Sequence, residues 1–440
     1  MISKDIKISF IGLGKLGLGL ALSISDSGIK VIGVDTNKKI IHKLKNGNLP
    51  LFEPGLETLL RKNLNTNFFI NSDKISAISQ TNVTYILIQT PSKKDGRFNS
   101  SFLEKLISEI CNELNRLNKK YHTLVICSTL QPGTIVSKIL PMINSYKNLE
   151  VGVNIGLVYN PESVALGEIA KGFQYPDYMI IGESDKYSGN LIRKISQKYT
   201  KNKPEIINMS LTSGEISKIT LNAFLCMKIS FANHISQITR NIDDADQSSI
   251  LRAIGFDKRI GSKFLKAGPS FGGTCFPRDV IAFSKFNNDI SISSDLIDSV
   301  KNINEYQHRL IQKDVKNIIK RAKIKNVCIF GYAFKENTPV TYLSPSINLL
   351  KGICSLNIKV SIFDPYIDKV ELDKNIKIYR SMEPALRNNS LIILMHNNHE
   401  ELSSLLLKIK QKKYIYDSWS NIKIDNNNHF IFKLGQRFDL

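Results

Sequence analysis

The chain has few cysteines, and their spacing suggests no structural role. Six are spread over 440 residues without the pairing of a disulfide framework or a zinc site, and most stand in apolar runs. Such usage is typical of a reducing compartment. There is also no apolar stretch of about 18 residues, the length of a membrane span, and the first residues lead into a strand-like run without a signal-peptide pattern. We therefore expect a soluble, cytoplasmic protein with no membrane partner.

Acidic residues are scarce relative to basic ones. There are 39 Asp and Glu against 60 Lys and Arg, a formal net charge of +21. The lysines are dispersed, without a dense basic block or an aromatic-basic platform, so we expect no nucleic-acid partner. A basic surface does favour a small anionic substrate such as a nucleotide diphosphate. With 42% hydrophobic residues and no short repeats, a chain of this length predicts two or three globular domains.

A glycine-rich loop follows the first strand-like run. Residues 6–11 are apolar, residues 12–17 read Gly-Leu-Gly-Lys-Leu-Gly, and residues 18–24 have helical character. In this setting the first glycine forms the turn, the second admits a pyrophosphate to the backbone, and the third lets the helix pack on the strand. The pattern predicts a dinucleotide-binding fold, with Gly12, Leu13, Gly14, Lys15, Leu16 and Gly17 against the cofactor.

The residue that ends the second strand bears on which dinucleotide is bound. Residues 30–34 form the strand, and Asp35 follows with a carboxylate that suits a ribose hydroxyl. Its charge would repel a 2′-phosphate, which favours NAD. Lys38 and Lys39 follow closely and leave NADP as an alternative.

Polar residues stand at the ends of three further strand-like runs. The runs cover residues 83–88, 123–126 and 151–158, with a helical segment at 101–117. This alternation predicts a parallel sheet, and ligands gather where parallel strands end. Glu162 is the only carboxylate at these ends and so the natural base, although each end taken singly also fits a simple turn. The strand-end residues are Gln89, Thr90, Pro91, Ser92, Ser128, Thr129, Asn160, Pro161 and Glu162.

Residues 213–241 predict one long helix that is apolar on several faces, which is typical of a buried helix. Lys218 and Asn222 are four residues apart and share one of its faces. A buried lysine is costly unless it meets an anion, so we expect Lys218 to face a negatively charged oxygen. The alternative is a lysine that snorkels at the helix edge.

One cysteine differs from the others because it ends a glycine-rich loop and precedes a helix start. Cys275 follows Gly272 and Gly273, and Pro277 suits the first turn of a helix. Free amide hydrogens and the helix dipole favour thiolate over thiol, so Cys275 is a candidate nucleophile with a lowered pKa. Asp279 lies one helical turn further on. The alternative is a small buried hydrophobe, which most free cysteines are.

Strands and helices alternate again in the last third of the chain. A helical region at 295–322 precedes strand-like runs at 327–330, 360–363, 391–395 and 414–416, with a helix at 345–356, and the tail from residue 421 predicts no further element. The glycines do not complete the dinucleotide pattern, so this unit predicts a mononucleotide ligand.

The predicted fold class is α/β, with two Rossmann-like doubly wound parallel-sheet domains joined by a long central helix and a helical middle domain. We expect a dinucleotide-binding domain at 1–203, a central helical domain with Cys275 at 204–322, and a nucleotide-binding domain at 323–440.

Together the motifs resemble the UDP-glucose/GDP-mannose dehydrogenase family. The resemblance extends over nearly the whole chain, and residues 275–279, with 259–261 ahead of them, are most similar to the UDP-glucose branch. It implies an NAD-dependent, four-electron oxidation of the C6 alcohol of a nucleotide sugar to a carboxylate, in the making of a polysaccharide precursor. The matching stretches are Gly12-x-Gly14-x-x-Gly17, Asn160-Pro161-Glu162, Lys218-x-x-x-Asn222, Phe271-Gly272-Gly273-x-Cys275-Phe276-Pro277-x-Asp279 and Phe334-Lys335-x-Asn337-Thr338.

The resemblance also implies roles for individual residues. Cys275 would add to the aldehyde left by the first oxidation, giving a thiohemiacetal and then a thioester that water hydrolyses. Lys218, helped by Asn222, would stabilise the oxyanions, and Asp279 would orient the lysine or a water. Glu162 would activate the hydrolytic water. The implied catalytic residues are Cys275, Lys218, Asp279, Glu162, Asn222 and Thr129.

The binding residues are implied in the same way. Arg259 is expected to reach the nucleotide sugar of a neighbouring subunit, which implies a homodimer or a larger homo-oligomer. The implied cofactor contacts are Gly12 to Gly17, Asp35, Thr90, Pro91, Ser128, Thr129 and Arg278. The implied substrate contacts are Glu162, Lys218, Asn222, Arg259, Phe264, Leu265, Lys266, Phe271, Gly272, Gly273, Phe334 and Lys335.

The chain departs from the family at three places. Leu166 replaces a usual glutamate, and a stretch with Pro339, Val340 and Tyr342 replaces one that includes an arginine to NAD. Trp419 and Ser420 stand where a second basic contact to the substrate is common. These departures leave the identity of the sugar open. They also predict a weaker affinity for the cofactor, because a lost charge-assisted hydrogen bond costs about 1.5–3 kcal/mol. The alternatives are a GDP-mannose or UDP-N-acetylhexosamine dehydrogenase, or a catalytically silent nucleotide-binding protein.

Overall fold

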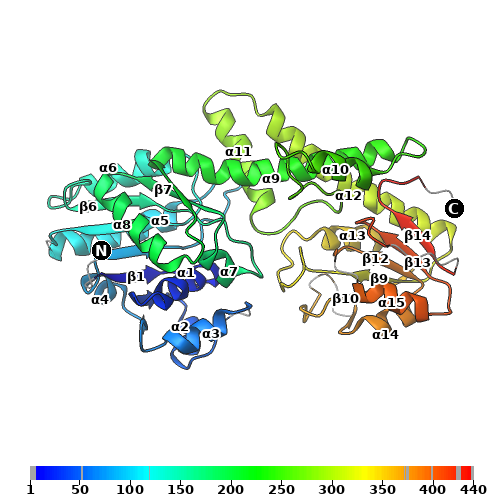
Figure 1. Cartoon of the computed structure of the whole chain (residues 1–440), viewed down its shortest axis with the longest axis horizontal. Helices are drawn as coiled ribbons and strands as arrows, with labels where there is room; N and C mark the ends of the chain where they lie inside the picture. Colours follow the sequence, from blue (N-terminus) through cyan, green and yellow to red (C-terminus); the bar gives the residue numbers. More distant parts are fainter. Residues whose placement is uncertain are drawn as a thin grey trace. The chain divides into compact units, whose positions relative to one another are not determined.

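The computed structural model describes residues 6–50, 53–117, 119–370, 372, 376–397, 400–422 and 428–437. The chain divides into two compact units, residues 1–220 and 221–440, each built on one sheet (Figure 1). The division into three domains at residues 203 and 322 stays a prediction. No helix among the described residues is long and apolar enough to cross a membrane.

The first unit contains an eight-stranded sheet of order β3-β2-β1-β4-β5-β6-β7-β8. Successive strands wind outward from the β1–β4 pair, which is the doubly wound arrangement. Neighbours are parallel except β6 and β7, which are antiparallel. The strands are β1 (Lys7–Ile11), β2 (Lys30–Val34), β3 (Phe68–Asn71), β4 (Val83–Ile86), β5 (His122–Ile126), β6 (Ile155–Tyr159), β7 (Tyr178–Glu183) and β8 (Glu205–Ser210).

Successive side chains of a strand point to opposite faces of the sheet and so enter two different hydrophobic cores. On β1, Ile8 and Phe10 enter a core with α1, α3, α7 and α8, whereas Ile11 enters a core with α4, α5 and α6. Helices thus cover both faces, as a mainly parallel sheet requires. The helical segments are α1 (Lys15–Asp26), α2 (Lys38–Lys45), α3 (Leu56–Asn63), α4 (Lys74–Ser79), α5 (Ser101–Leu117), the π-helix η1 (Ile135–Ile139), α6 (Leu140–Asn144), α7 (Ile169–Gln174) and α8 (Lys186–Tyr199).

The prediction of this sheet is incomplete. It omits β3, which has only four residues, and β7 and β8, which have six residues each but carry polar residues at their ends. The strand predicted from residue 151 begins at Ile155 instead, because the amides of Val153 and Asn154 both bond to the carbonyl of Glu150 in a turn. The predicted helix at 101–117 coincides with α5.

The second unit contains a six-stranded parallel sheet of order β11-β10-β9-β12-β13-β14. On β9, Val327 and Ile329 pack with α12 (Asp295–Arg321) and α13 (Pro345–Ile353). Cys328 and Phe330 pack with α14 (Met382–Asn388) and α15 (Glu400–Lys408) on the opposite face (Figure 1). The strands are β9 (Asn326–Phe330), β10 (Lys359–Phe363), β11 (Lys377–Tyr379), β12 (Leu391–Leu394), β13 (Tyr414–Asp417) and β14 (Phe430–Lys433). The α/β prediction with two doubly wound sheets is confirmed.

The expectation that the strand at residues 414–416 is the last one is wrong. β14 extends the sheet beside β13, and a four-residue strand after a polar segment gives too weak a sequence signal to predict. β11 is missed for the same reason. The remaining helices are α9 (Leu211–Thr239), α10 (Gln247–Gly255), α11 (Phe276–Asp289), α12 (Asp295–Arg321), α13 (Pro345–Ile353), α14 (Met382–Asn388) and α15 (Glu400–Lys408).

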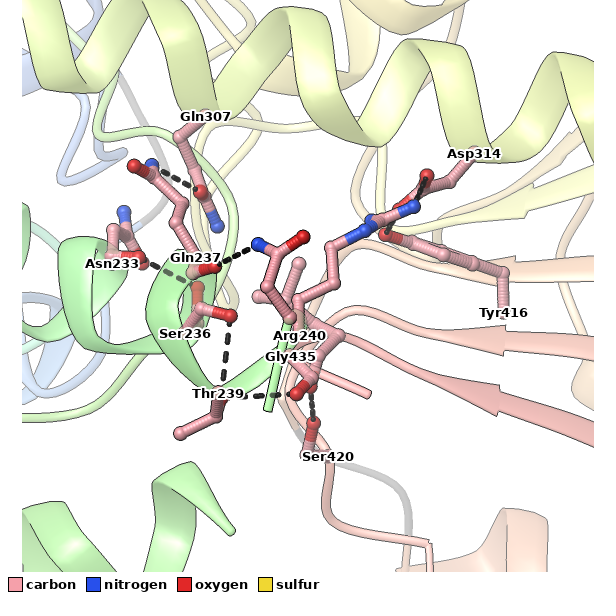
Figure 2. Close-up of polar contacts among 12 residues, drawn as sticks. Asn233, Ser236, Gln237, Thr239, Arg240, Gln307, Asp314, Tyr416, Ser420 and Gly435 are labelled. Atoms are coloured by element: carbon pink, nitrogen blue, oxygen red, sulfur yellow. Dashed lines mark hydrogen bonds and ion pairs between the residues drawn. The ribbon is translucent and has the colours of Figure 1, made fainter. Parts of the chain in front are cut away.

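A buried polar network anchors the carboxyl end of α9 (Figure 2). The guanidinium of Arg240 donates to both carboxylate oxygens of Asp314 at 2.5 and 2.6 Å, and the hydroxyl of Tyr416 donates to one of them at 3.0 Å. Next to it, the Thr239 hydroxyl donates to the carbonyl of Gly435 at 2.9 Å. Asp314 is fully buried, and Arg240 supplies the opposite charge that a buried carboxylate needs.

Candidate active site

The glycine loop between β1 and α1 is tightly packed on one side and open on the other. Gly12 has φ +98°, and a Cβ there would lie 2.2 Å from the carbonyl oxygen of Leu87. A Cβ on Gly17 would lie 2.0 Å from the carbonyl oxygen of Gly12. A Cβ on Gly14 would meet no atom within 4 Å, so this backbone is accessible to a ligand.

Asp35 ties the end of β2 to this loop. Its carboxylate accepts hydrogen bonds from the amides of Leu13 and Asn37, both at 2.7 Å. A carboxylate has about four acceptor positions, so these bonds orient Asp35 and leave it able to accept from a ribose hydroxyl. Leu13 itself is fully buried, whereas Gly14 is exposed and Leu16 is half-buried.

Two of the predicted strand-end loops are joined directly. The hydroxyl of Thr90 donates to the carbonyl of Thr129 at 2.6 Å, and the hydroxyl of Ser128 donates to the carbonyl of Ile88 at 2.7 Å. The loops after β4 and β5 are therefore held together next to the strand that carries the glycine loop. Pro91 is exposed.

The third strand end meets α9. The ammonium of Lys218 donates to the backbone carbonyl of Glu162 and lies 3.9 Å from its carboxylate. Lys218 is only 6% exposed, so it does not snorkel at the helix edge. The carboxylate of Glu162 also accepts from the amide of Val164 at 2.9 Å. Leu166, at the place of the family's glutamate, packs against the core on the α1 face of the sheet.

The sequence patterns do not predict one buried carboxylate of α9 as a site residue. Glu215 is fully buried and accepts from the amides of Gly133 at 2.7 Å and Ile135 at 3.0 Å, at the start of η1. Burial raises its pKa to about 7, against the lowering effect of the two amides. An acid three residues before Lys218 in an apolar helix is the signal that could have identified it.

In the second unit, Cys275 stands immediately before α11. Its side chain is exposed, and the hydroxyl of Thr274 lies 3.5 Å from its sulfur. Gly273 has φ +84°, and a Cβ there would lie 2.5 Å from the ring of Phe334, which brings two predicted substrate residues together. Gly272 is equally confined, because a Cβ would lie 2.1 Å from the carbonyl oxygen of Leu343.

A fully buried carboxylate lies behind this cysteine. Asp279 accepts from the side-chain amide of Asn222 at 2.6 Å and from the guanidinium of Arg278 at 3.1 Å. Its amide closes the first helical turn on the carbonyl of Cys275 at 2.8 Å. α9 and α11 are thereby joined through charged and polar groups one turn from the thiol.

Aromatic and basic side chains lie on both sides of Cys275 in the sequence. The Phe276 ring lies 6.4 Å from that of Phe264 and 6.2 Å from that of Phe271, both edge-on. The ammonium of Lys266 donates to the side-chain oxygens of Asn397 at 3.1 Å and Asn421 at 2.7 Å.

Lys266 also meets one of the departures from the family. Its ammonium lies 5.9 Å from the centre of the Trp419 ring, and burial lowers its pKa although Asp417 and Glu336 oppose this. The Trp419 indole donates to the carbonyl of Met395 at 3.1 Å.

Other predicted substrate residues are not gathered with these. Arg259 is exposed and pairs with Asp257 at 2.7 Å, within its own turn. Leu265 is buried, and Lys335 is half-buried. Tyr342, at the place of the family's arginine, is 60% exposed. Among the described residues, no group of three or more His, Cys, Asp or Glu could hold a metal.

Family models match the chain in three successive parts. The NAD binding domain of the UDP-glucose/GDP-mannose dehydrogenase family matches residues 6–200, its central domain 212–306, and its UDP binding domain 328–424. The chain belongs to this family. It is thus an NAD-binding member of a family of nucleotide-sugar dehydrogenases, and the open backbone at Gly14 and the placement of Asp35 fit that cofactor.

Individual relatives differ in the sugar named. The chain is 29% identical to a GDP-mannose 6-dehydrogenase of Pseudomonas syringae pv. tomato over 94% of this chain and 95% of that one. It is 31% identical to a UDP-glucose 6-dehydrogenase of Rickettsia bellii over 82% of this chain and 81% of that one.

Solved structures agree on the fold. A UDP-glucose dehydrogenase from Pyrobaculum islandicum matches with a TM-score of 0.88 at 24% identity over 99% of both chains. A UDP-D-ManNAc dehydrogenase from Pyrococcus horikoshii matches with a TM-score of 0.83 at 22% identity over 98% of this chain and 99% of that one.

Proposed function

We propose that the protein oxidises the C6 alcohol of a UDP-sugar, UDP-glucose first among them, to the carboxylate. The observation that carries the proposal is the exposed thiol of Cys275 at the start of α11, one turn from the buried Asp279–Asn222 pair. An exposed thiol after a glycine loop is free to attack a bound carbonyl, whereas the buried cysteines are not.

The chemistry divides into two oxidations separated by a covalent step. NAD, when bound, accepts the hydride that each oxidation releases. The aldehyde from the first oxidation has no second hydride placed for transfer until a nucleophile adds to its carbon. Cys275 adds through sulfur to give a thiohemiacetal, which on oxidation becomes a thioester. Water then hydrolyses the thioester, which frees the thiol and leaves the carboxylate.

The residues around Lys218 and Asp279 have supporting roles. The ammonium of Lys218 stabilises the oxyanions of the covalent intermediates, with help from the amide of Asn222. Asp279 holds that amide in one orientation at 2.6 Å. Glu162, whose carboxylate lies near Lys218, takes a proton from the hydrolytic water, and Thr129 assists through a second water.

Substrate binding involves a second copy of the chain. Arg259 is exposed and held in its turn by Asp257, so its guanidinium can serve a neighbouring subunit. The amino group of Lys228 fixes that turn to α9 by donating to the carbonyls of Ile260 and Gly261 at 3.0 and 3.2 Å. We therefore include a homodimer or larger homo-oligomer in the proposal.

A panel of nucleotide sugars tests the substrate and the stoichiometry together. UDP-glucose, UDP-N-acetylhexosamines and GDP-mannose are incubated with NAD, and uronate and NADH are both quantified. We expect two NADH per uronate from UDP-glucose. Turnover of GDP-mannose alone would establish the second candidate, which the similarity to GDP-mannose 6-dehydrogenases favours. One NADH per product would exclude the thioester route, and no turnover at all would favour a silent nucleotide-binding protein.

Replacement of the thiol tests the covalent step. Cys275→Ser should lower turnover about a thousandfold or more, or trap an ester, because a hydroxyl is a poorer nucleophile at neutral pH. Cys354→Ser, at another exposed cysteine of the same unit, is the matched control and should leave turnover unchanged. Full four-electron turnover in Cys275→Ser would contradict the assignment.

A further inference from the structure

The loop that leads to Cys275 is not held by its own backbone. In the part of the chain that the structure describes, no backbone–backbone hydrogen bond involves residues 266–274. Backbone groups without such partners have to be satisfied by side chains or by water. The position of this loop, and of the thiol at its end, therefore depends on side chains that reach it from neighbouring helices.

The first such contact is at Gly268. Its amide donates to the side-chain oxygen of Asn233 on α9 at 2.9 Å, and its carbonyl accepts from the side-chain amide of Gln307 on α12 at 2.9 Å. Gln307 is oriented in turn by the side-chain amide of Gln237, which donates to it at 3.1 Å (Figure 2). Asn233 and Gln307 are both fully buried, so this end of the loop is fixed in the protein interior.

The second contact is at Phe271, nearer the thiol. The side-chain oxygen of Asn304 accepts from the amide of Phe271 at 2.7 Å, and the side-chain nitrogen of Asn304 donates to the carbonyl of the same residue at 3.1 Å. Two bonds to one residue fix the direction of its backbone as well as its position. Asn304 precedes Gln307 by three residues, so both project from one face of α12.

Packing alone does not fix this second contact. A cavity of about 320 Å³ adjoins it, and Phe271 and Asn304 are both among its lining residues. The exposed side chains of Lys301 and Arg309 also line the cavity, so water can enter it. Water can satisfy the backbone of Phe271 when Asn304 is removed, but it does not hold that backbone in one direction. Asn304 therefore affects the placement of the loop more than the stability of the fold.

We propose that Asn304 is a positioning residue, which holds the backbone of Phe271 so that the loop presents Cys275 to the oxidised carbon of the sugar. The inference rests on the proposed function. In that function the thiol is needed only after the first hydride has left the alcohol. A misplaced loop therefore slows the addition of sulfur to the aldehyde more than it slows the first oxidation, and the aldehyde has time to leave.

The ratio of released aldehyde to uronate tests this role. UDP-glucose, or whichever sugar of the panel the wild type oxidises, is incubated with NAD and semicarbazide, which traps free aldehyde, and uronate is quantified in parallel. We expect Asn304→Ala to raise the ratio about tenfold or more. Asn304→Asp keeps an acceptor for the amide of Phe271 and should raise it less. Asn302→Ala, at an exposed asparagine of the same helix, is the matched control and should keep the wild-type ratio.

The ratio separates positioning from stability, because a loss of folded enzyme lowers both products equally. The melting temperature of Asn304→Ala should stay within about 4 °C of the wild type, since water replaces the lost bonds. An unchanged ratio in Asn304→Ala beside normal wild-type turnover would overturn the inference and leave the proposed function intact. A wild type that makes no uronate from any sugar of the panel would contradict both. If Asn304→Ala does not fold, Asn304→Asp decides by the same comparison.

Discussion

The second sheet has the same strand order as the first six strands of the first sheet. The acid that follows the second strand of each sheet nevertheless has a different role in the two units. In the first unit Asp35 is half-buried and holds one amide of the glycine loop. In the second unit Asp364 is 2% exposed, accepts from the amides of Tyr332 and Ala333 at 2.9 and 3.0 Å, and accepts from Tyr366 at 3.0 Å. The first acid is available to a ligand, whereas the second serves the fold.

The loops beneath these acids differ accordingly. Space over Gly14, the third residue after β1, is open, whereas Ala333, the third residue after β9, is only 2% exposed. The hydroxyls of Ser344 and Ser346 donate to the carbonyls of Tyr332 and Gly331. Topology alone therefore does not make a dinucleotide site. A dinucleotide site also needs a backbone that a ligand can approach and a carboxylate that can still accept a hydrogen bond from it.

The largest expected effect comes from filling the turn of the glycine loop. Gly12→Ala should destabilise the first unit by about 2–4 kcal/mol, because its φ is positive and its Cβ would strike the Leu87 carbonyl. Gly14→Ala should leave the unfolding free energy nearly unchanged and still weaken NAD binding about tenfold or more, since only the ligand needs that space. Denaturant titration and calorimetry measure the two effects. Equal destabilisation by both variants would remove the distinction between packed and open glycines.

The next effect is the pH dependence of the unfolding free energy that a buried acid of the first unit, Glu215, should cause. The pKa of Glu215 is raised from 4.5 to about 7, so the folded state binds its proton more tightly than the unfolded state does. Its stabilising contribution is complete below pH 4.5 and is lost as the pH rises through 7, a change on the order of 3 kcal/mol. Denaturant titrations from pH 4 to 8 should show this fall, and Glu215→Gln should flatten it. An unaltered slope in the variant would assign the effect to another group.

Exchanging each strand-end acid for its amide tests the comparison itself. Asp364→Asn should destabilise the second unit by about 1–3 kcal/mol, because a buried amide is left without an acceptor. Asp35→Asn should cost less stability and instead weaken NAD relative to NADP. Amide hydrogen exchange locates the loss of stability, and calorimetry gives the affinities. Loss of NAD affinity in Asp364→Asn alone would reverse the roles given to the two acids.

The smallest effect concerns a buried base in the second unit. Burial, with a contribution from Arg387, lowers the pKa of Lys413 from 10.5 to about 8. The unfolded state then binds more protons between pH 8 and 10.5, so stability should rise over that range, opposite in sign to Glu215. Three acceptors around the ammonium, the carbonyls of Arg387 and Asn389 and the Gln411 side chain, limit the gain to about 1–2 kcal/mol. Lys413→Met should abolish the rise in denaturant titrations from pH 8 to 10.

The sequence predicts local features of this protein well. The glycine loop, the acid after β2 and helix α5 all follow from patterns within about 30 residues. Features that depend on distant partners escape it. Glu215 acquires its environment from amides some 80 residues away in sequence. The contact of Lys266 with Asn397 and Asn421 is likewise invisible in a linear pattern.

Helix α9 carries Glu215, Lys218 and Asn222 within eight consecutive residues, each engaged with a different partner segment. Because successive residues of a helix are offset by about 100°, inserting one residue after Glu215 would swing the two later side chains away together. A change in the length of α9 should therefore disrupt these contacts more than a substitution elsewhere in the helix would.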